Sequence, residues 1–202
     1  MKDNREYRTM ELRIASPAEG EEPSYIVRGY ASTFDPYVLF TDKDGIAYSE
    51  RIEPTAFDEA DLSDVVFRLD HEGRVYARSS AGTVELWTDE NGLGQQTDLS
   101  KTQAAREVFA DIEAGNYPQM SFAFTVAPEG DKFDRATHTR IISRIAKVYD
   151  VSPVAFSANP NTSLGVATRD YFHGVMEAEK AERLECEKRE RRKQIIRLLT
   201  EV

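Results

Sequence analysis

The sequence predicts an α+β fold in which short strands, arranged as a barrel or a sandwich, are followed by a long charged helix. Between about residues 8 and 156, apolar or alternating segments are separated by Gly, Pro and Asp at the spacing typical of β domains. Two segments within this region have helical spacing instead. After residue 167 the composition changes abruptly to strong helix formers without proline.

The predicted strands are short and well separated, which favours a barrel or a sandwich over a doubly wound sheet. They are expected over residues 9–15, 25–33, 64–69, 83–88, 120–126, 138–148 and 151–156.

Two helices are predicted between these strands. The first, "EPTAFDEAD", has Pro54 in its first turn. The second, over residues 100–116, opens with a capping box of Ser100 and Gln103 and closes at Gly115. An apolar stripe on the second helix is expected to pack on a sheet, and it consists of Ala105, Val108, Phe109 and Ile112.

The region from residue 168 to residue 202 is predicted to be a charged helical tail that begins near Asp170 and follows a domain of residues 1–167. Its middle, "EAEKAERLECEKRERRK", is either a solvated helix with i,i+4 charge pairs or a segment that binds a partner or a second copy. The apolar positions gather at its two ends: Tyr171, Phe172, Val175 and Met176, then Ile195, Ile196, Leu198 and Leu199. A basic cluster, Lys188, Arg189, Arg191, Arg192 and Lys193, could contact an acidic partner.

Length, charge and cysteine content limit the size of the protein, its partners and its compartment. A chain of 202 residues fits one domain and an appendage. Its net charge of -10 disfavours nucleic acid as the primary partner, and anionic membranes likewise. The N-terminal segment has no apolar signal region, and no run is long enough to span a membrane. The single Cys186 suits a reducing cytosol and is expected to be inert.

The segment "YPQMSFAFTV" places a hydroxyl in an apolar strand. At strand period, Ser121 points away from the face that carries Met120 and Phe122, and it shares its own face with the small residues Ala123 and Thr125. Ser121 is therefore a candidate nucleophile. Such a role requires a base within hydrogen-bond reach and usually a third group that orients the base.

The three histidines differ in context. His71 follows an apolar strand and precedes Gly73, so it is the strongest candidate base, although a partly buried structural role is an alternative. His138 lies in a charged turn and His173 lies on the C-terminal helix, which suits solvated surface groups.

Asp150 is the candidate orienting acid. It interrupts the apolar stretch "AKVYDVSPVAF", where a carboxylate needs a cationic or hydrogen-bonding partner, although a turn acid at a strand break is an equal alternative. Asp70 and Glu72 flank His71, but neighbours in a strand point to opposite faces and would orient the ring poorly. No His/Cys cluster has metal-ligand spacing, and we expect neither a metal nor an organic cofactor.

Six segments in order resemble the prohead (capsid maturation) protease family of tailed bacteriophages over about residues 10–165. They are "VRGYASTF", "ERIEPTAF", "VVFRLDHEG", "AGTVELWTDENGLG", "AGNYPQMSFAF" and "KVYDVSPVAFSANPNT". The resemblance implies the fold of herpesvirus assemblins, a mainly antiparallel β-barrel with surrounding helices. It also implies that Ser121 is the nucleophile, His71 the base and Asp150 the third, acidic member.

Two departures from the family pattern lie outside these three positions. Thr55 replaces a glycine that the family usually has before Ala-Phe, and Ser157 replaces a proline before "ANP". The loop from Ser157 through Ala158 to Asn159 could supply backbone N–H donors to an oxyanion, and Ala123 and Thr125 would border the substrate groove. Because assemblins use a histidine as third member, His138 is an alternative to Asp150.

The resemblance further implies a serine endopeptidase that cleaves scaffold, or the scaffold-like region of the major capsid protein, and then itself. It would act inside the assembling procapsid in the host cytoplasm, and it could form a homodimer. An alternative is a catalytically silent assembly module that binds through its C-terminal helix. An esterase is disfavoured because "PQMSFAF" lacks a G-x-S-x-G elbow.

Overall fold

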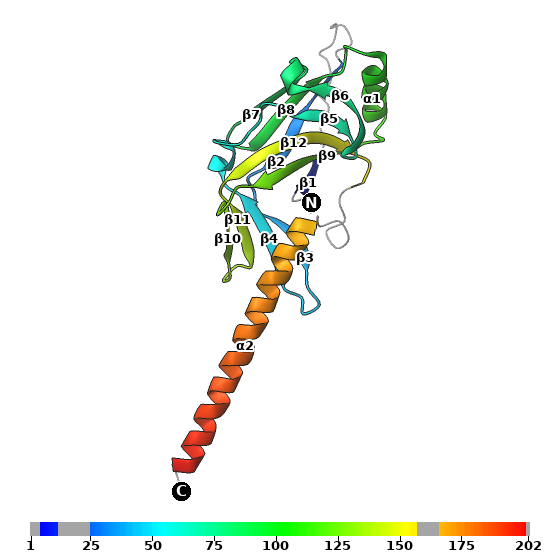
Figure 1. The fold of residues 1–202 in the computed structure, drawn as a ribbon. Coiled ribbons are helices and arrows are strands. Elements are labelled where there is room, and N and C mark those ends of the chain that lie inside the picture. The colour runs from blue at the N-terminus through cyan, green and yellow to red at the C-terminus, as the bar shows by residue number, and fades with distance from the viewer. Residues whose placement is uncertain (1–4, 12–24, 157–165, 201–202) are drawn as a thin grey trace.

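The computed structural model describes residues 5–11, 25–156 and 166–200. The described chain is an α+β structure of mostly strands, with one short helix beside the strands and one long helix at the C-terminal end (Figure 1). The strands form three sheets around a common core.

The largest sheet has the strand order β1-β9-β12-β5-β6. Neighbouring strands are antiparallel except β12 and β5, which are parallel. Their bounds are β1 Glu6–Glu11, β5 Val66–Leu69, β6 Glu72–Arg78, β9 Gln119–Val126 and β12 Ile145–Val154.

The two smaller sheets complete the body, and within them only β11 and β4 pair in parallel. The four-stranded sheet contains β10 Asp131–Asp134, β11 Thr139–Ile142, β4 Ala47–Ile52 and β3 Tyr37–Thr41. The three-stranded sheet contains β2 Ile26–Thr33, β8 Gly92–Asp98 and β7 Val84–Thr88.

The predicted closed barrel is not found in the described residues. Strands β1 and β6 are the two edges of the five-stranded sheet. Among the described residues, neither edge pairs with a strand of another sheet, so the sheet does not close. After β6 the chain bends through the 3₁₀ turn η2 (Ser79–Ala81) and enters a different sheet at β7. The sheets are therefore held together by side-chain packing, and not by one continuous hydrogen-bonded ladder.

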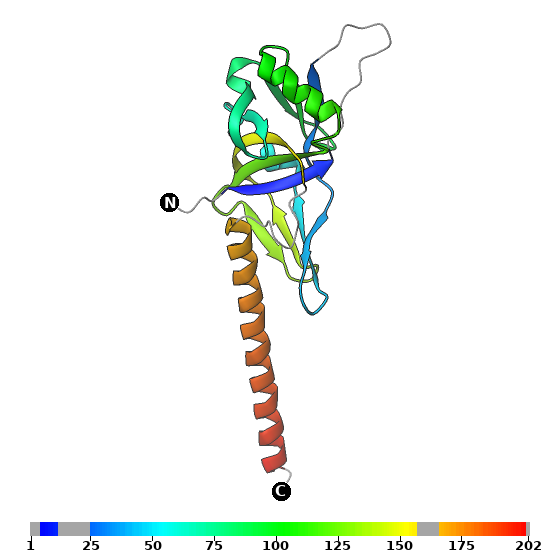
Figure 2. The same cartoon turned by 90° about the vertical axis from the view of Figure 1, so that its right-hand side faces the viewer.

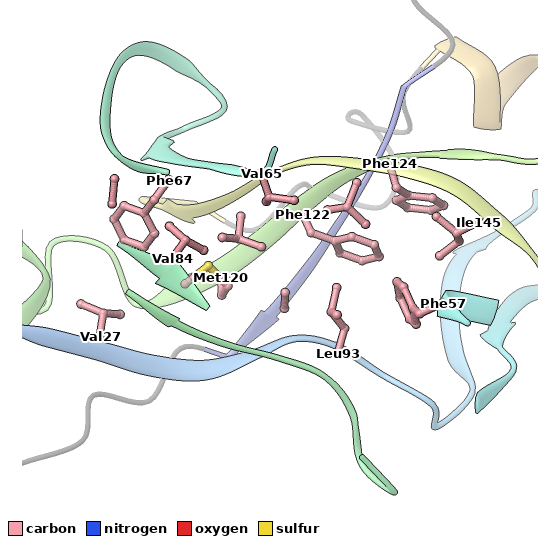
Figure 3. Close-up of a cluster of buried hydrophobic side chains, with 14 of the residues drawn as sticks. Val27, Phe57, Val65, Phe67, Val84, Leu93, Met120, Phe122, Phe124 and Ile145 are labelled. Atoms are coloured by element: carbon pink, nitrogen blue, oxygen red, sulfur yellow. The ribbon is translucent and has the colours of Figure 1, made fainter. Parts of the chain in front are cut away.

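The main core lies between the five-stranded and three-stranded sheets (Figure 3). Phe122 and Phe124 of β9 stack with their ring centroids 4.6 Å apart, and Phe57 packs against Phe122. Leu93 of β8 lies on the opposite side of this cluster (Figure 3). Because Phe122 faces this core, Ser121 before it faces the other side of the sheet.

Helix α1 (Gln103–Glu113) packs on the core through the predicted stripe, whose four residues are all buried. Its N-cap differs from the prediction: Thr102, not Ser100, accepts a hydrogen bond from the N–H of Ala105. Gly115 follows the helix with a φ of 82°, a left-handed conformation that glycine adopts without strain.

Other boundaries also differ from the prediction. The expected helix at residues 53–61 is only the 3₁₀ turn η1 (Pro54–Phe57). The expected strands 138–148 and 151–156 divide at Ser143 and Arg144 instead, so that Asp150 lies within β12 and not at a strand break. Strands β3, β4, β6, β8 and β10 were not predicted, because charged, glycine-rich or turn-like letters conceal their alternation.

Helix α2 (Val166–Thr200) begins against the body and extends away from it in both views (Figures 1 and 2). Phe172 is buried against Tyr48 of β4 and Phe40 of β3. Farther along, Leu184, Ile195 and Ile196 are exposed. The apolar residues of the first turns thus cover the four-stranded sheet.

A buried cluster of four charged residues links the sheets near the start of α2. Glu6 and Arg8 of β1 form ion pairs with Arg140 of β11 and Glu50 of β4, respectively. All four side chains are at most 5 % exposed. The hydroxyl of Thr168 in α2 donates to Glu6 at 2.8 Å. Arg140 also pairs at 2.7 Å with the less buried Asp131, so each buried charge has an opposite charge beside it in a place that is shielded from water.

Replacing Glu6 by Gln should destabilise the fold by about 3 kcal/mol at pH 7, because it leaves Arg140 incompletely paired in the interior. Burial alone would raise the pKa of Glu6, but Arg140 and Arg8 lower it from 4.5 to about 2. Its contribution is therefore complete above pH 4.5 and is lost as the pH falls towards 2.

Urea unfolding of the wild type and Glu6→Gln at several pH values measures this difference. Glu53→Gln, which removes a partly exposed ion pair with Arg51, is the control and should change little. A stability difference between wild type and Glu6→Gln that stays constant from pH 7 to pH 3 would contradict the assignment.

Candidate active site

Ser121 lies on β9, between the neighbouring strands β1 and β12. Its Cα partners are Thr9 on β1 and Ser152 on β12. The residue is only 1 % exposed, and it faces away from the aromatic core behind the sheet. A strand that is paired on both sides therefore fixes the backbone of this residue.

His71 lies in a two-residue hairpin turn between β5 and β6, and not within a strand. Leu69 and Glu72 pair across the turn, while Asp70 and His71 have φ values of 48° and 61°. Positive φ at both central residues is the geometry of a type I′ turn, which matches the twist of the flanking strands. The turn projects the imidazole from the end of the hairpin.

Asp70 anchors this turn to the end of β12. Its N–H donates to the carbonyl of Pro153 at 3.0 Å, and its carboxylate accepts from the N–H of Ala155 at 3.0 Å. Aspartate is among the residues that tolerate left-handed φ, because its short side chain can bond locally. Asp70 thus positions the hairpin and does not orient the imidazole itself.

Asp150 occupies the middle of β12 and is 1 % exposed. Its Oδ1 lies 2.6 Å from Nδ1 of His71 and accepts from Ser152 Oγ at 2.7 Å. Its Oδ2 accepts from the Arg68 guanidinium at 3.1 Å. Burial alone would raise the pKa of Asp150, but the hydrogen bonds from His71 and Ser152 and the charge of Arg68 lower it.

The structure brings Ser121, His71 and Asp150 into one hydrogen-bonded chain. Nε2 of His71 lies 2.7 Å from Ser121 Oγ, on the opposite side of the ring from Asp150. A charged carboxylate can only accept, so Nδ1 carries the proton and Nε2 is left to accept from the serine hydroxyl. Tyr7 of β1 contacts the imidazole edge-on with ring centroids 4.5 Å apart.

A cavity of about 410 Å³ opens beside this chain of hydrogen bonds. It is lined by Tyr7, Thr9, Asp70, His71, Glu72, Ser121, Val154 and Phe156. Phe156 is 87 % exposed, so this side of the cavity presents an apolar surface to solvent. Ser121 and His71 are both among the lining residues, so the hydrogen-bonded chain borders this open space.

None of the other predicted site residues that the structure describes belongs to this chain of hydrogen bonds. Ala123 and Thr125 are not among the residues that line this cavity, so their role in a substrate groove stays a prediction. The expected oxyanion loop, Ser157, Ala158 and Asn159, lies outside the described residues. His138, the alternative third member, contacts Tyr48, and the position beside Nδ1 of His71 is occupied by Asp150.

The model of the caudovirus prohead serine protease family matches residues 9–176, which is most of the chain. The chain belongs to this family. The prohead protease match confirms the resemblance found in the sequence, and it shows a phage protease of capsid maturation.

Comparisons with individual proteins add less. One similar solved structure is that of the bacteriophage T4 capsid assembly protease. The match covers 75 % of this chain and 99 % of the T4 chain, with a TM-score of 0.46 and 12 % sequence identity. No curated protein matches the prohead protease chain.

The described residues contain neither a metal-binding cluster nor a membrane-spanning helix. Within residues 5–11, 25–156 and 166–200, no group of three or more His, Cys, Asp or Glu side chains could hold a metal ion. None of the helices in this part of the chain is long and apolar enough to cross a membrane.

Sequence reasoning missed Arg68, Ser152, Tyr7 and Thr9. Arg68 stands out as a cation in the apolar strand "VVFRL", and Ser152 follows Asp150 by two residues, which places both on one face of a strand. Those signals were available in the sequence. Tyr7 and Thr9 could be found only from the pairing of β1 with β9.

Replacing Asp70 by Ala should destabilise the prohead protease by about 1 kcal/mol, because alanine is strained at this φ and loses the bond from Ala155. Asp70→Asn is the matched control, since asparagine tolerates left-handed φ and keeps an acceptor oxygen. Chemical unfolding of the three proteins measures the effect. Equal losses in the Ala and Asn variants would show that the anchor is not the cause.

Proposed function

We propose that this chain is a Ser-His-Asp endopeptidase that cleaves scaffold or the scaffold-like region of the major capsid protein, and itself, inside the procapsid. One observation carries the catalytic part: Ser121, His71 and Asp150 form a continuous hydrogen-bonded chain beside an open cavity. Family membership supports the biological part.

In the proposed mechanism Ser121 Oγ attacks the scissile carbonyl carbon while Nε2 of His71 accepts its proton. Asp150 holds Nδ1–H and stabilises the positive charge that develops on the ring. The imidazole then returns the proton to the leaving amine, and water hydrolyses the acyl-enzyme by the same route. None of these steps requires a metal or an organic cofactor.

The geometry favours this role over a silent assembly module. A silent assembly module does not require a serine 2.7 Å from one ring nitrogen of a histidine whose other nitrogen contacts a buried carboxylate. The three groups come from β9, the β5–β6 hairpin and β12, so their convergence depends on the whole five-stranded sheet. Such an arrangement is the known requirement for activating a hydroxyl.

Ser121→Ala should abolish cleavage of the capsid or scaffold protein of the same phage when the two proteins are co-expressed. His71→Ala should be similarly inactive, and Asp150→Asn should lose at least about a thousandfold in rate, because the three groups act as a unit. Intact mass measurement of the capsid protein detects the cleavage.

Ser80→Ala is the matched control for this series, since Ser80 is exposed and bonds only to Asp64 among the hydrogen bonds described. Cleavage that persists in Ser121→Ala would reject the nucleophile and favour the silent assembly module.

We further propose that residues 1–167 form the protease domain and that the tail, residues 168–202, recruits it to its capsid or scaffold partner or to a second copy. The first turns of α2 support the body as well, since Thr168 and Phe172 are buried on it. The exposed remainder is free to serve recruitment without a cost to the fold.

Removing residues 183–202 should leave the unfolding temperature unchanged and reduce co-purification with the capsid protein. Removing residues 168–202 should also destabilise the body by about 3 kcal/mol, because the core contact of Phe172 is lost. Thermal unfolding and affinity co-purification measure the two effects. Full co-purification of both truncated proteins would exclude recruitment through the tail.

A further inference from the structure

The carboxylate of Asp150 is held at both oxygens. Oδ1 faces Nδ1 of His71 at 2.6 Å and Ser152 Oγ at 2.7 Å, and Oδ2 faces the Arg68 guanidinium at 3.1 Å. Donors on both oxygens prevent rotation of the carboxylate about its Cβ–Cγ bond. Only Oδ1 is presented to the imidazole, and its direction is fixed.

Charge makes the Arg68 contact different from the other two. An imidazole that can accept the serine proton is neutral, and the Ser152 hydroxyl is neutral too. Each therefore gives the buried Asp150 a hydrogen bond but no positive charge. The other ionisable groups that line the adjoining cavity are Tyr7 from β1 and Asp70 and Glu72 from the hairpin, and none of them is a cation.

Arg68 lies where it can serve this purpose. Its side chain is 20 % exposed, so most of it is shielded from water, while its Nη2 reaches Asp150. It belongs to β5, which pairs in parallel with β12 and leads directly into the turn that carries His71. The cation and the base therefore belong to the same hairpin.

We propose that Arg68 is a positioning residue for the proposed reaction: its guanidinium fixes Oδ2 of Asp150 and supplies the positive charge that keeps this carboxylate ionised beside a neutral imidazole. The proposal rests on the proposed function. It assigns Arg68 no contact with substrate, and its effect reaches Ser121 only through Asp150 and His71.

The test uses a fluorescent fluorophosphonate probe, which reacts with an activated serine and requires no knowledge of the natural substrate. The phosphorus bonds to Ser121 Oγ, fluoride leaves, and His71 accepts the serine proton. Labelling rates are measured from pH 4 to 9 for full-length wild type, Arg68→Met and Arg68→Lys. Ser121→Ala gives the background, and peptide mass spectrometry locates the label.

Arg68→Met should slow labelling of Ser121 by roughly ten- to a hundredfold, and Arg68→Lys should recover much of the rate because it restores the charge. Arg68 is one of the groups that lower the pKa of Asp150. Its loss makes the surroundings of the His71–Asp150 pair more negative, which favours proton uptake by the pair and blocks transfer from Ser121. Activity on the acid side should therefore fail at higher pH in Arg68→Met than in wild type.

Arg78→Met is the matched control. Arg78 lies on β6 of the same hairpin, and it pairs at 3.2 Å with Asp64, where both side chains are nearly half exposed. This variant should label at the wild-type rate with the wild-type pH profile. Circular dichroism confirms folding, and Arg68→Gln replaces Arg68→Met should the latter not fold.

Two failures are distinguishable. A wild type that is not labelled at Ser121 above the Ser121→Ala background overturns the proposed function and the role of Arg68 with it. A wild type that is labelled, beside a folded uncharged Arg68 variant with the same rate and pH profile, overturns the role of Arg68 alone.

Discussion

A buried negative charge in the middle of a strand is the constraint around which this site is arranged. Asp150 is almost completely shielded from water, and a lone carboxylate there would be unstable or protonated. Its neighbours meet this requirement from three directions, through an imidazole, a hydroxyl and a guanidinium. The same contacts that make the charge tolerable also aim the imidazole at Ser121, so stability and geometry have one origin.

The second buried charge cluster extends this principle to the rest of the body. Glu6 and Arg8 lie on β1 on either side of Tyr7, which contacts the imidazole of His71. Their ion pairs reach the four-stranded sheet and the first turn of α2. Strand β1 therefore connects the edge of the cavity beside Ser121 with the first turn of the long helix.

The sequence indicated the strand-rich fold, helix α1 and its buried stripe, because apolar periodicity is a local property. It could not give the division into three sheets, since the bend after β6 and the edges of β1 depend on packing between distant strands. The structure brings Ser121, His71 and Asp150 into contact, while the catalytic roles that the family resemblance implied for them stay predictions. The hairpin of His71 was concealed because Asp70 and His71 occupy conformations usually taken by Asn-Gly.

The length of α2 sets the distance between the body and any partner that binds the outer end of the helix. The helix contacts the body as far as Glu182, which pairs with Arg135, and continues to Thr200 without a proline, a rise of roughly 27 Å at 1.5 Å per residue. A tether attached near its outer end would behave as a stiff spacer. It would set a fixed radius for the catalytic body around its anchor, and so limit which bonds on an inner shell surface come within range.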